Sequence, residues 1–369
     1  MPHILCAGIA VLDEVFRVRE FPLPDNKVEA SDFITVGGGC AANAAVAIVR
    51  LGGKVTFAAP LGGPAGQNTI GDAIGDRLVR GLTEEGVDCS GCVRVPGART
   101  PVSAIFINAR GDRSIATYRD HRLNAAVPAD PDRLVAGVDA VLVDNRFAGF
   151  VTPICRAARR AGLPVVIDAD RPTVETEALF AIGTHVIFSG ECLRLTTGTD
   201  DLAAGLARMA QFTDAFIAVS NGPLPVLWRE DRAIREMAVF PITAVDTLGA
   251  GDVFHGAFAL ALRRPRDCRR DAVRRRFGWA QMHAVRRQHR RATPPRGRGA
   301  AGAVRRKFWR ADRRTGGDVA SASPAVEVSW AHDLGMSQNP PAALQKMSIM
   351  VLPRPASSKG RHGDPETLA

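Results

Sequence analysis

Length, composition and charge set the first limits. The chain has 369 residues, of which 46% are hydrophobic, 23% charged and 6% aromatic, and these values exclude a fibrous, collagen-like or wholly disordered protein. No apolar run approaches the roughly 18 to 20 residues of a membrane span, and the N-terminus lacks the features of a secretory signal. We therefore expect a globular protein in the cytoplasm, with one large α/β domain or two smaller ones and no membrane partner.

The formal net charge of +10 comes from one segment. Residues 1–262 carry 24 Lys and Arg against 30 Asp and Glu, residues 263–314 carry 20 against 3, and residues 315–369 carry 4 against 5. A basic arm for nucleic acid would contain lysines and interleaved aromatic residues, but Lys307 is the only lysine in residues 263–314. We therefore expect no nucleic-acid partner and keep such an arm as a minor alternative.

Apolar strand-like runs alternate with helical patterns through residues 1–262, which predicts a largely parallel sheet covered by helices. The predicted strands are Ile4–Ile9, Val55–Ala59, Ala140–Asp144, Val165–Asp168, His185–Phe188 and Ala215–Val219. The predicted helices are Ala41–Leu51, Ile74–Glu85, Val151–Ala161, Leu202–Gln211 and Gly251–Leu262. Two segments with period-two patterning, Val28–Val36 and Pro101–Tyr118, predict a small antiparallel flap inserted into this core.

The apolar periodicity stops after Leu262. Arginine doublets, Pro294-Pro295 and later Ser/Pro-rich stretches take its place, so residues 263–369 are predicted to be a poorly ordered tail.

The seven cysteines are scattered and odd in number, which argues against a disulfide framework as the basis of the fold. Cys89 and Cys92 have the spacing of a metal or redox pair but no second pair beside them, so loop thiols are the favoured interpretation.

Two glycine clusters contain the residues that indicate a chemical function. The first, Gly37–Asn43, ends a strand and starts a helix, and it fits neither the dinucleotide-binding pattern nor a P-loop. Its small residues let a ligand approach the backbone, and Asn43 can donate to and accept from a sugar hydroxyl. The second, Asp246–Asp252, opens an apolar helix whose free N–H groups can hold a phosphoryl oxygen. Asp252 could accept a proton from an attacking hydroxyl, or it could simply cap the helix.

In this order, the two clusters resemble the two signatures of the ribokinase-like carbohydrate kinases, the phosphofructokinase B family. The resemblance runs from about Ile4 to Leu262. It implies an α/β fold with a mostly parallel sheet, helices on both faces and a small antiparallel β lid. Residues 1–262 would form the kinase core, with lid segments at about 14–36 and 98–120. The implied enzyme uses ATP and Mg²⁺ to phosphorylate a hydroxymethyl group of a sugar or nucleoside.

The resemblance also implies roles for single residues. Asp252 is implied to be the catalytic base, with Gly249, Ala250 and Gly251 as the anion hole for the transferred phosphoryl group. The implied sugar-binding residues are Asp13, at the end of the first strand, together with Gly38, Gly39 and Asn43. Asp246 and Thr247 lie where some members bind a monovalent cation such as K⁺. The lid is implied to close over the sugar and to form a homodimer contact.

The chain departs from the family pattern around the nucleotide. Ser189–Cys192 stands where the family usually has Asn-x-x-Glu for magnesium and phosphate, and Glu191 could serve one position away. Ser220 and Gly222 lie in the nucleotide-binding loop, where prolines replace some of the usual glycines. Gly62-Gly63-Pro64 replaces a customary Gly-Asp. Each departure could reflect an altered function or the drift of a surface loop.

Lys27 and Arg146 are candidates for recognising the substrate. Both occupy positions that resemble those in sulfofructose kinases, a branch of the family, and both could face an anionic group on the sugar. The alternative is that they are two solvated surface cations.

The end of the chain differs from the family in a way that a shifted reading frame explains. The codons of Gln281-Met282-His283, read one base later, require a cysteine between Lys or Arg and Thr or Met. The next shifted codons permit a run ending in Gly-Gly, which resembles the C-terminal motif that the family has and this chain lacks. We therefore hypothesise a single-base frameshift at about Leu262–Arg266, with activity impaired if the protein carries it.

Two other functions stay open at this point. One is a nucleoside kinase of the same fold, with an adenosine-like substrate. The other is a catalytically impaired relic that still binds a sugar.

Overall fold

The computed structural model describes residues 1–64, 72–172, 176–239 and 249–262. Internal contacts divide the chain into two units, Met1–Gly297 and Arg298–Ala369, and all described residues belong to the first. Asp246, Thr247 and the tail 263–369 lie outside the described residues.

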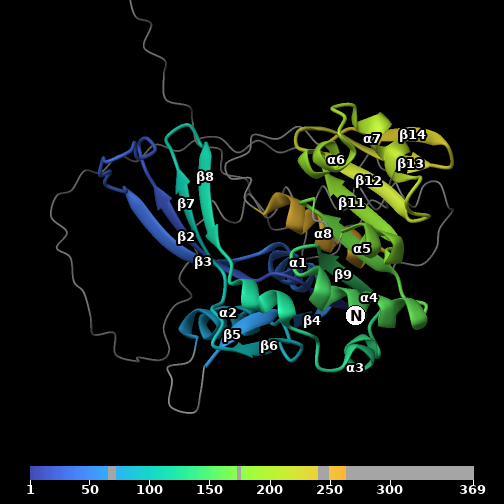
Figure 1. Cartoon of the computed structure of the whole chain (residues 1–369), viewed down its shortest axis with the longest axis horizontal. Helices are drawn as coiled ribbons and strands as arrows, with labels where there is room; N and C mark the ends of the chain where they lie inside the picture. The colour runs from blue at the N-terminus through green and yellow to red at the C-terminus, as the bar shows by residue number, and fades with distance from the viewer. Residues whose placement is uncertain (65–71, 173–175, 240–248, 263–369) are drawn as a thin grey trace, which may run out of the picture. The chain divides into compact units, whose positions relative to one another are not determined.

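A central sheet of eight strands forms the core, in the order β14-β13-β12-β11-β10-β9-β1-β4 (Figure 1). Neighbouring strands in the series β12, β11, β10, β9, β1 and β4 are parallel, and β13 and β14 add an antiparallel edge. Their bounds are β1 His3–Ala7, β4 Lys54–Ala58, β9 Ala140–Asp144, β10 Val165–Ala169, β11 His185–Ser189, β12 Phe216–Asn221, β13 Leu224–Glu230 and β14 Ala233–Met237. All six strands predicted for this sheet occur. The antiparallel edge was not predicted.

Helices cover both faces of the central sheet, as predicted, because its strands are apolar on both sides. On one face lie α1 (Cys40–Arg50), α2 (Ala73–Glu84) and α8 (Ala250–Ala261). The other face is covered by α4 (Ala148–Arg160), α5 (Thr176–Ile182), α6 (Gly190–Thr197) and α7 (Leu202–Met209), with α3 (Pro131–Val135) packed on α4. Among the described residues, no helix is both long and apolar enough to cross a membrane.

Helices α1 and α8 pack closely because small residues face each other. A Cβ atom at Gly256 would lie 2.8 Å from the carbonyl oxygen of Ala44, so only glycine fits there. Every residue of α8 from Val253 to Ala261 is buried. This contact fixes the beginning of α8 next to the beginning of α1, although the two helices are about 200 residues apart in the sequence.

The predicted flap is a four-stranded sheet in the order β3-β2-β7-β8. Its strands are β2 (Val11–Arg17), β3 (Asp32–Gly38), β7 (Val102–Ile107) and β8 (Arg113–Tyr118). The β2–β3 and β7–β8 pairs are antiparallel, as expected for the flap, whereas the central β2–β7 pair is parallel. The short 3-10 helix η1 (His121–Ala125) follows β8, and β5 (Pro60–Gly63) pairs with β6 (Val93–Pro96) in a separate two-stranded sheet.

Strand β2 was not predicted, because only three residues separate it from β1 and the two read as one apolar run. From the sequence we expected Asp13 at the end of the first strand, and this expectation was wrong. Asp13 lies inside β2, opposite Val36 of β3.

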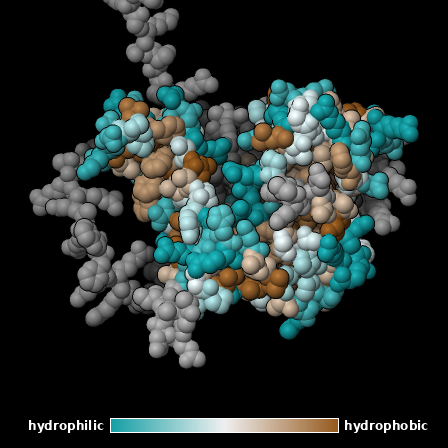
Figure 2. All heavy atoms as spheres, viewed as in Figure 1, coloured by the Kyte–Doolittle hydropathy of each residue, from teal (hydrophilic) through white to brown (hydrophobic). Residues whose placement is uncertain are grey.

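The small sheet exposes apolar side chains. Phe33, Ile34, Ile115 and Tyr118 are each about half exposed, and in Figure 2 tan and brown side chains gather over this sheet. Single exposed apolar residues are common on proteins, but a group on one small sheet marks a surface suited to contact with another molecule.

Candidate active site

Several carboxyl groups gather where the parallel strands of the central sheet end. In open α/β sheets, the carboxyl ends of the strands form the crevice in which ligands bind. Asp144 ends β9, Asp168 and Asp170 lie at the end of β10, and the N-termini of α1 and α8 reach the same region.

The first glycine cluster lies against Asp13. Gly39 has φ 100 and is the N-cap of α1, and a Cβ atom there would lie 2.4 Å from the carbonyl oxygen of Ile9. A Cβ atom at Gly38 would lie 1.9 Å from Oδ2 of Asp13. Gly39 is thus required for its backbone conformation, whereas at Gly38 the Asp13 carboxylate occupies the space that a side chain would fill.

Asn43 and Asp252 join the two glycine clusters. The side-chain amide of Asn43, on the first turn of α1, donates to Oδ2 of Asp252 over 2.7 Å. Asp252 lies in the first turn of α8, which begins after Gly249 in the left-handed conformation, with φ 73. The Cβ position of Gly249 lies 3.3 Å from Nδ2 of Asn43 and 3.4 Å from Oδ2 of Asp252. The structure therefore brings Gly38, Gly39 and Asn43 to the same place as the Gly249–Asp252 turn.

The beginning of α8 has the form of an anion site. The first N–H groups of a helix have no partner within the helix, and its dipole favours negative charge there. Gly249 has no side chain to cap the helix, and its turn lies beside the Asp252 and Asn43 side chains. A phosphoryl oxygen is the kind of ligand that such a turn binds.

A cluster of acidic groups, which we call the acid cluster, surrounds Asp252. Ligand atoms of Cys40, Asp168 and Asp252 all lie within 4.8 Å of one another, and Cys40 Sγ donates to Oδ2 of Asp170 over 3.5 Å. Burial, together with the neighbouring carboxylates, raises the pKa of Asp168 and that of the Cys40 thiol. The raised pKa values favour the protonated forms of Asp168 and Cys40.

His255 lies directly behind the acid cluster. Its Nδ1 donates to the carbonyl oxygen of Gly251 over 2.8 Å and lies 3.2 Å from Oδ2 of Asp168. The ring is buried, and burial lowers its pKa to about 4. A neutral imidazole therefore packs against the Asp168 carboxyl group at neutral pH.

Asp144 connects three segments at the edge of the site. Its carboxylate accepts hydrogen bonds from the backbone N–H groups of Ile9, Ala41 and Arg146, at 2.8, 3.1 and 3.0 Å. A Cβ atom at Gly8 would lie 2.2 Å from its Oδ2, so the carboxylate lies tightly against the turn after β1. Burial raises the pKa of Asp144 to about 6. Asp144 thus holds the N-terminus of α1 against the ends of β1 and β9.

The two candidate cations differ in position. Arg146 forms an ion pair with Asp170, and its side chain is 22% exposed, so it lies at the acid cluster with its charge already balanced. Lys27 lies exposed in the segment between β2 and β3. Of the two, Arg146 is the one that the structure brings to the site.

The candidate nucleotide residues lie one and two strands further along the sheet. Ser189 of β11 pairs with Ser220 of β12, and the Cβ position of Gly190 lies 3.4 Å from the carbonyl oxygen of Ser220. Glu191 is exposed on the first turn of α6, and Gly222 has φ 57 in the turn after β12. These residues form one group at the carboxyl ends of β11 and β12, beside β10 and the acid cluster.

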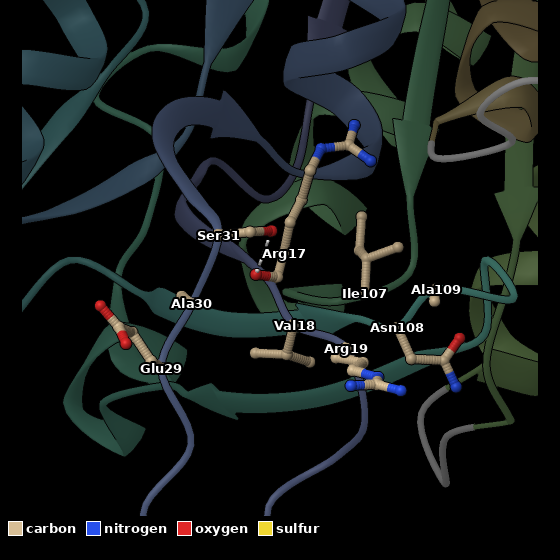
Figure 3. A pocket seen from close by; sticks show the side chains of 9 residues that line it. All are labelled: Arg17, Val18, Arg19, Glu29, Ala30, Ser31, Ile107, Asn108 and Ala109. Carbon is tan, nitrogen blue, oxygen red and sulfur yellow. Dashed lines mark hydrogen bonds between the residues drawn. The ribbon is translucent and has the colours of Figure 1, made fainter. Parts of the chain in front are cut away.

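A cavity of about 680 Å³ lies elsewhere, at the outer end of the small sheet. Its lining residues include Arg17, Arg19, Glu29 and Asn108. In Figure 3 the guanidinium groups of Arg17 and Arg19 lie well apart from each other. The acid cluster, not this cavity, has the polar groups that a reaction needs.

Sequence reasoning missed Asp144, Asp168, Asp170 and His255. The signal for the aspartates was available, because each follows an apolar run predicted as a strand, and such positions face the crevice of a parallel sheet. His255 gave no signal, since a histidine within an apolar helix is indistinguishable from a packing residue until its neighbours are known.

Comparison with known proteins assigns the family. The family model for pfkB family carbohydrate kinases matches residues 1–286. Ribokinase of Haemophilus influenzae is 25% identical over 259 residues, 68% of this chain and 82% of that protein. Fructokinase-1 of Zea mays is 26% identical over 248 residues, 62% of this chain and 74% of that protein.

Solved structures agree in fold. A protein of Agrobacterium tumefaciens, solved as a candidate ribokinase, has a TM-score of 0.70 and 36% identity, covering 77% of this chain and 91% of its own. Arabidopsis thaliana ribokinase, solved with ribose and ATP, has a TM-score of 0.63 and 21% identity, covering 76% of this chain and 91% of its own. The chain therefore belongs to the pfkB family of carbohydrate kinases and has the ribokinase-like fold.

Proposed function

We propose that this chain is an ATP-dependent sugar kinase that transfers the γ-phosphate of ATP to a hydroxymethyl group of a sugar, with Asp252 as the general base. One observation carries the proposal: Asp252, held by Asn43 at 2.7 Å, shares its surroundings with the Gly249 turn. The base and the anion-binding turn are thus close enough to act on the two partners of one transfer. Relatives named ribokinase, deoxyribokinase and fructokinase support a sugar as the acceptor.

The proposed reaction needs positioning and charge stabilisation more than covalent chemistry. The sugar hydroxyl gives its proton to Asp252 as its oxygen attacks the γ-phosphorus, and the bond to the leaving oxygen of ADP breaks. The N–H groups of Ala250 and Gly251 at the start of α8 face the negative charge on the phosphoryl oxygens. Asp13, Gly38, Gly39 and Asn43 hold the sugar so that this hydroxyl meets the base.

The residues present are compatible with Mg²⁺ and ATP. Mg²⁺ prefers oxygen ligands and in kinases is held by substrate phosphates with one or two carboxylates, and Glu191 offers such a carboxylate beside Ser220 and Gly222. When bound, Mg²⁺ neutralises charge on the β- and γ-phosphates. Ser220, Gly222 and Glu191 are proposed to bind the nucleotide, whereas K⁺ at Asp246 and Thr247 would lie outside the described residues.

The small sheet is proposed to be a lid and a homodimer contact. Phe16 stacks between Phe33 and Phe106, with ring centroids 4.8 and 5.5 Å away, so apolar packing continues to the exposed Phe33. Asp13 lies in β2 of this sheet, so any movement of the sheet moves a proposed sugar ligand. A lid of this kind would exclude water from the transfer.

ADP release tests the proposal. The purified chain is incubated with ATP, Mg²⁺ and either a panel of ketoses and aldoses or a panel of purine nucleosides, with Asp252→Asn as the control. Sugar-dependent ADP release that Asp252→Asn abolishes supports the proposal, and release with nucleosides alone assigns a nucleoside kinase instead. Sugar binding in calorimetry with no ADP release identifies a relic and overturns the kinase proposal.

A further inference from the structure

Cys89 and Cys92 lie in the turn between α2 and β6, away from the acid cluster. The backbone N–H of Cys92 donates to the carbonyl oxygen of Cys89 over 3.0 Å, which makes them the first and last residues of a hydrogen-bonded β-turn. In such a turn the two Cα atoms are less than about 7 Å apart. A disulfide needs Cα atoms about 4.4 to 6.8 Å apart, so the turn sets the backbone spacing that a disulfide requires.

The turn is held firmly on strand β4. Phe57 N–H donates to the carbonyl oxygen of Asp88 over 2.7 Å, and Val93 N–H donates to that of Ala59 over 2.9 Å. A Cβ atom at Gly91 would lie 2.9 Å from the carbonyl oxygen of Phe57, so the turn cannot move closer to the strand. The positions of the two thiols are therefore fixed by the fold rather than by chance encounters in a loose loop.

The two thiols are chemically unequal. The neighbouring side chains of Cys92 and of Thr83 in α2 lower the pKa of the Cys89 thiol. The Cys89 side chain and burial raise the pKa of Cys92. Cys89 Sγ donates to the carbonyl oxygen of Val87, and Cys92 Sγ donates to that of Phe57, both over 3.8 Å. By contrast, burial raises the pKa of Cys155 and of Cys192 to about 12, so these thiols are inert. Cys89 and Cys92 are also both partly exposed.

We propose that Cys89 and Cys92 are an oxidisable pair that closes to a disulfide when the protein meets a low-molecular-weight disulfide. Cys89, as thiolate, attacks one sulfur of the oxidant, forms a mixed disulfide and releases one thiolate. Cys92 then loses its proton and attacks Cys89 Sγ, which forms the internal disulfide and releases the second thiolate. The protein loses two protons and two electrons, and the oxidant takes up both and is reduced to two thiols. The disulfide fixes the connection between α2 and β6.

The sequence makes the test direct. Trypsin cleaves after Arg80 and Arg94, and the peptide 81–94 contains both cysteines and no others. The folded full-length chain is treated with glutathione disulfide, quenched in acid, alkylated and digested for mass spectrometry. We expect peptide 81–94 to lose two hydrogens and to resist alkylation. Peptide 28–50, which contains Cys40 alone, is the internal control and should stay reduced.

Two variants test the order of attack. In Cys92→Ser no second thiol can attack the mixed disulfide, so peptide 81–94 should accumulate a glutathione adduct on Cys89. In Cys89→Ser the adduct on Cys92 should form roughly tenfold more slowly or not at all, because burial keeps that thiol protonated. If peptide 81–94 of the unmodified chain stays reduced, or collects glutathione without closing, the pair is not a disulfide site. Faster adduct formation on Cys92 than on Cys89 would overturn the assigned roles.

Discussion

His255 should make the stability of this protein depend on acid in a predictable way. The ring is 3% exposed, donates from Nδ1 to Gly251 and packs against Asp168. Its pKa in the folded state is about 4, below the value of 6.5 for an unperturbed histidine. The folded protein therefore binds fewer protons at this residue than the unfolded chain between pH 4 and pH 6.5, and stability is lost as the pH falls through this window.

The lowered pKa of His255 also gives the size of the change in the free energy of unfolding. A difference of about 2.5 pKa units corresponds to about 3 kcal/mol when the whole window is crossed, and to about 2 kcal/mol between pH 7 and pH 5. Asp168 and Asp144 act in the opposite direction, because their raised pKa values make the folded protein bind more protons than the unfolded chain. The slope of the unmodified protein alone is thus uninformative, and the comparison with a variant isolates His255.

His255→Asn keeps a donor near the Nδ1 position and removes the titrating ring. Urea unfolding followed by tryptophan fluorescence, to which the buried Trp228 contributes, gives the free energy of unfolding at pH 7 and pH 5 in EDTA. The difference in the free energy of unfolding between the unmodified protein and His255→Asn should be about 2 kcal/mol less in favour of the unmodified protein at pH 5 than at pH 7. His121→Asn, the same substitution at an exposed histidine, is the matched control. A constant difference between the unmodified protein and His255→Asn at both pH values would show that burial does not hold this ring neutral.

Four further substitutions test the site, the core and the backbone conformation. Asp252→Asn should lower kcat by roughly 10² to 10⁴ with little change in the KM for the sugar, as measured by ADP release, because only the proton acceptor is lost. Phe150→Ala, at a fully buried position on α4, should lower the free energy of unfolding by about 3 to 5 kcal/mol in the same urea assay. Gly39→Ala should destabilise the fold by more than about 2 kcal/mol, because φ is 100 and the new Cβ meets the carbonyl oxygen of Ile9. Gly81→Ala, exposed inside α2 with open space around it, should instead stabilise the protein by about 0.5 to 1 kcal/mol. Equal effects at the two glycines would refute the reasoning from backbone conformation.

The sequence predicted the parts of the fold that periodicity and glycine encode. The buried strands read as continuous apolar runs, and the five predicted helices all occur with ends within three residues of those observed. Gly39 and Gly249 could be recognised because glycine tolerates positive φ at the start of a helix, and both have it. The sequence could not separate β1 from β2, since the break at Gly8–Ala10 is short and both flanks are apolar.

The acid cluster could not be assembled from the sequence, because its members come from different elements. Cys40 begins α1, Asp168 ends β10 and Asp252 begins α8, and only the order of the strands brings them within 4.8 Å. The same limit applies to the partner of Arg146. The sequence made Arg146 a candidate to face an anionic group on the sugar, whereas the structure pairs it with Asp170. Interactions between sites far apart in the chain depend on topology, which residue patterns do not encode.

The C-terminal end of the kinase core is where sequence and family still disagree, and DNA can decide between the explanations. The family model extends to residue 286, while the last described helix, α8, ends at Ala261 and the Arg-rich segment starts at residue 263. A single-base shift near Leu262–Arg266 accounts for the abundance of arginine, because GC-rich codons read out of frame often encode Arg, Pro and Gly. Resequencing the coding DNA across codons 258–285 should recover a frame that contains the cysteine required behind Met282 and a following Gly-Gly run. An unchanged frame, together with no family resemblance in the neighbouring one, would refute the frameshift and leave the described core, with Asp252 and Asn43 in contact, as it is.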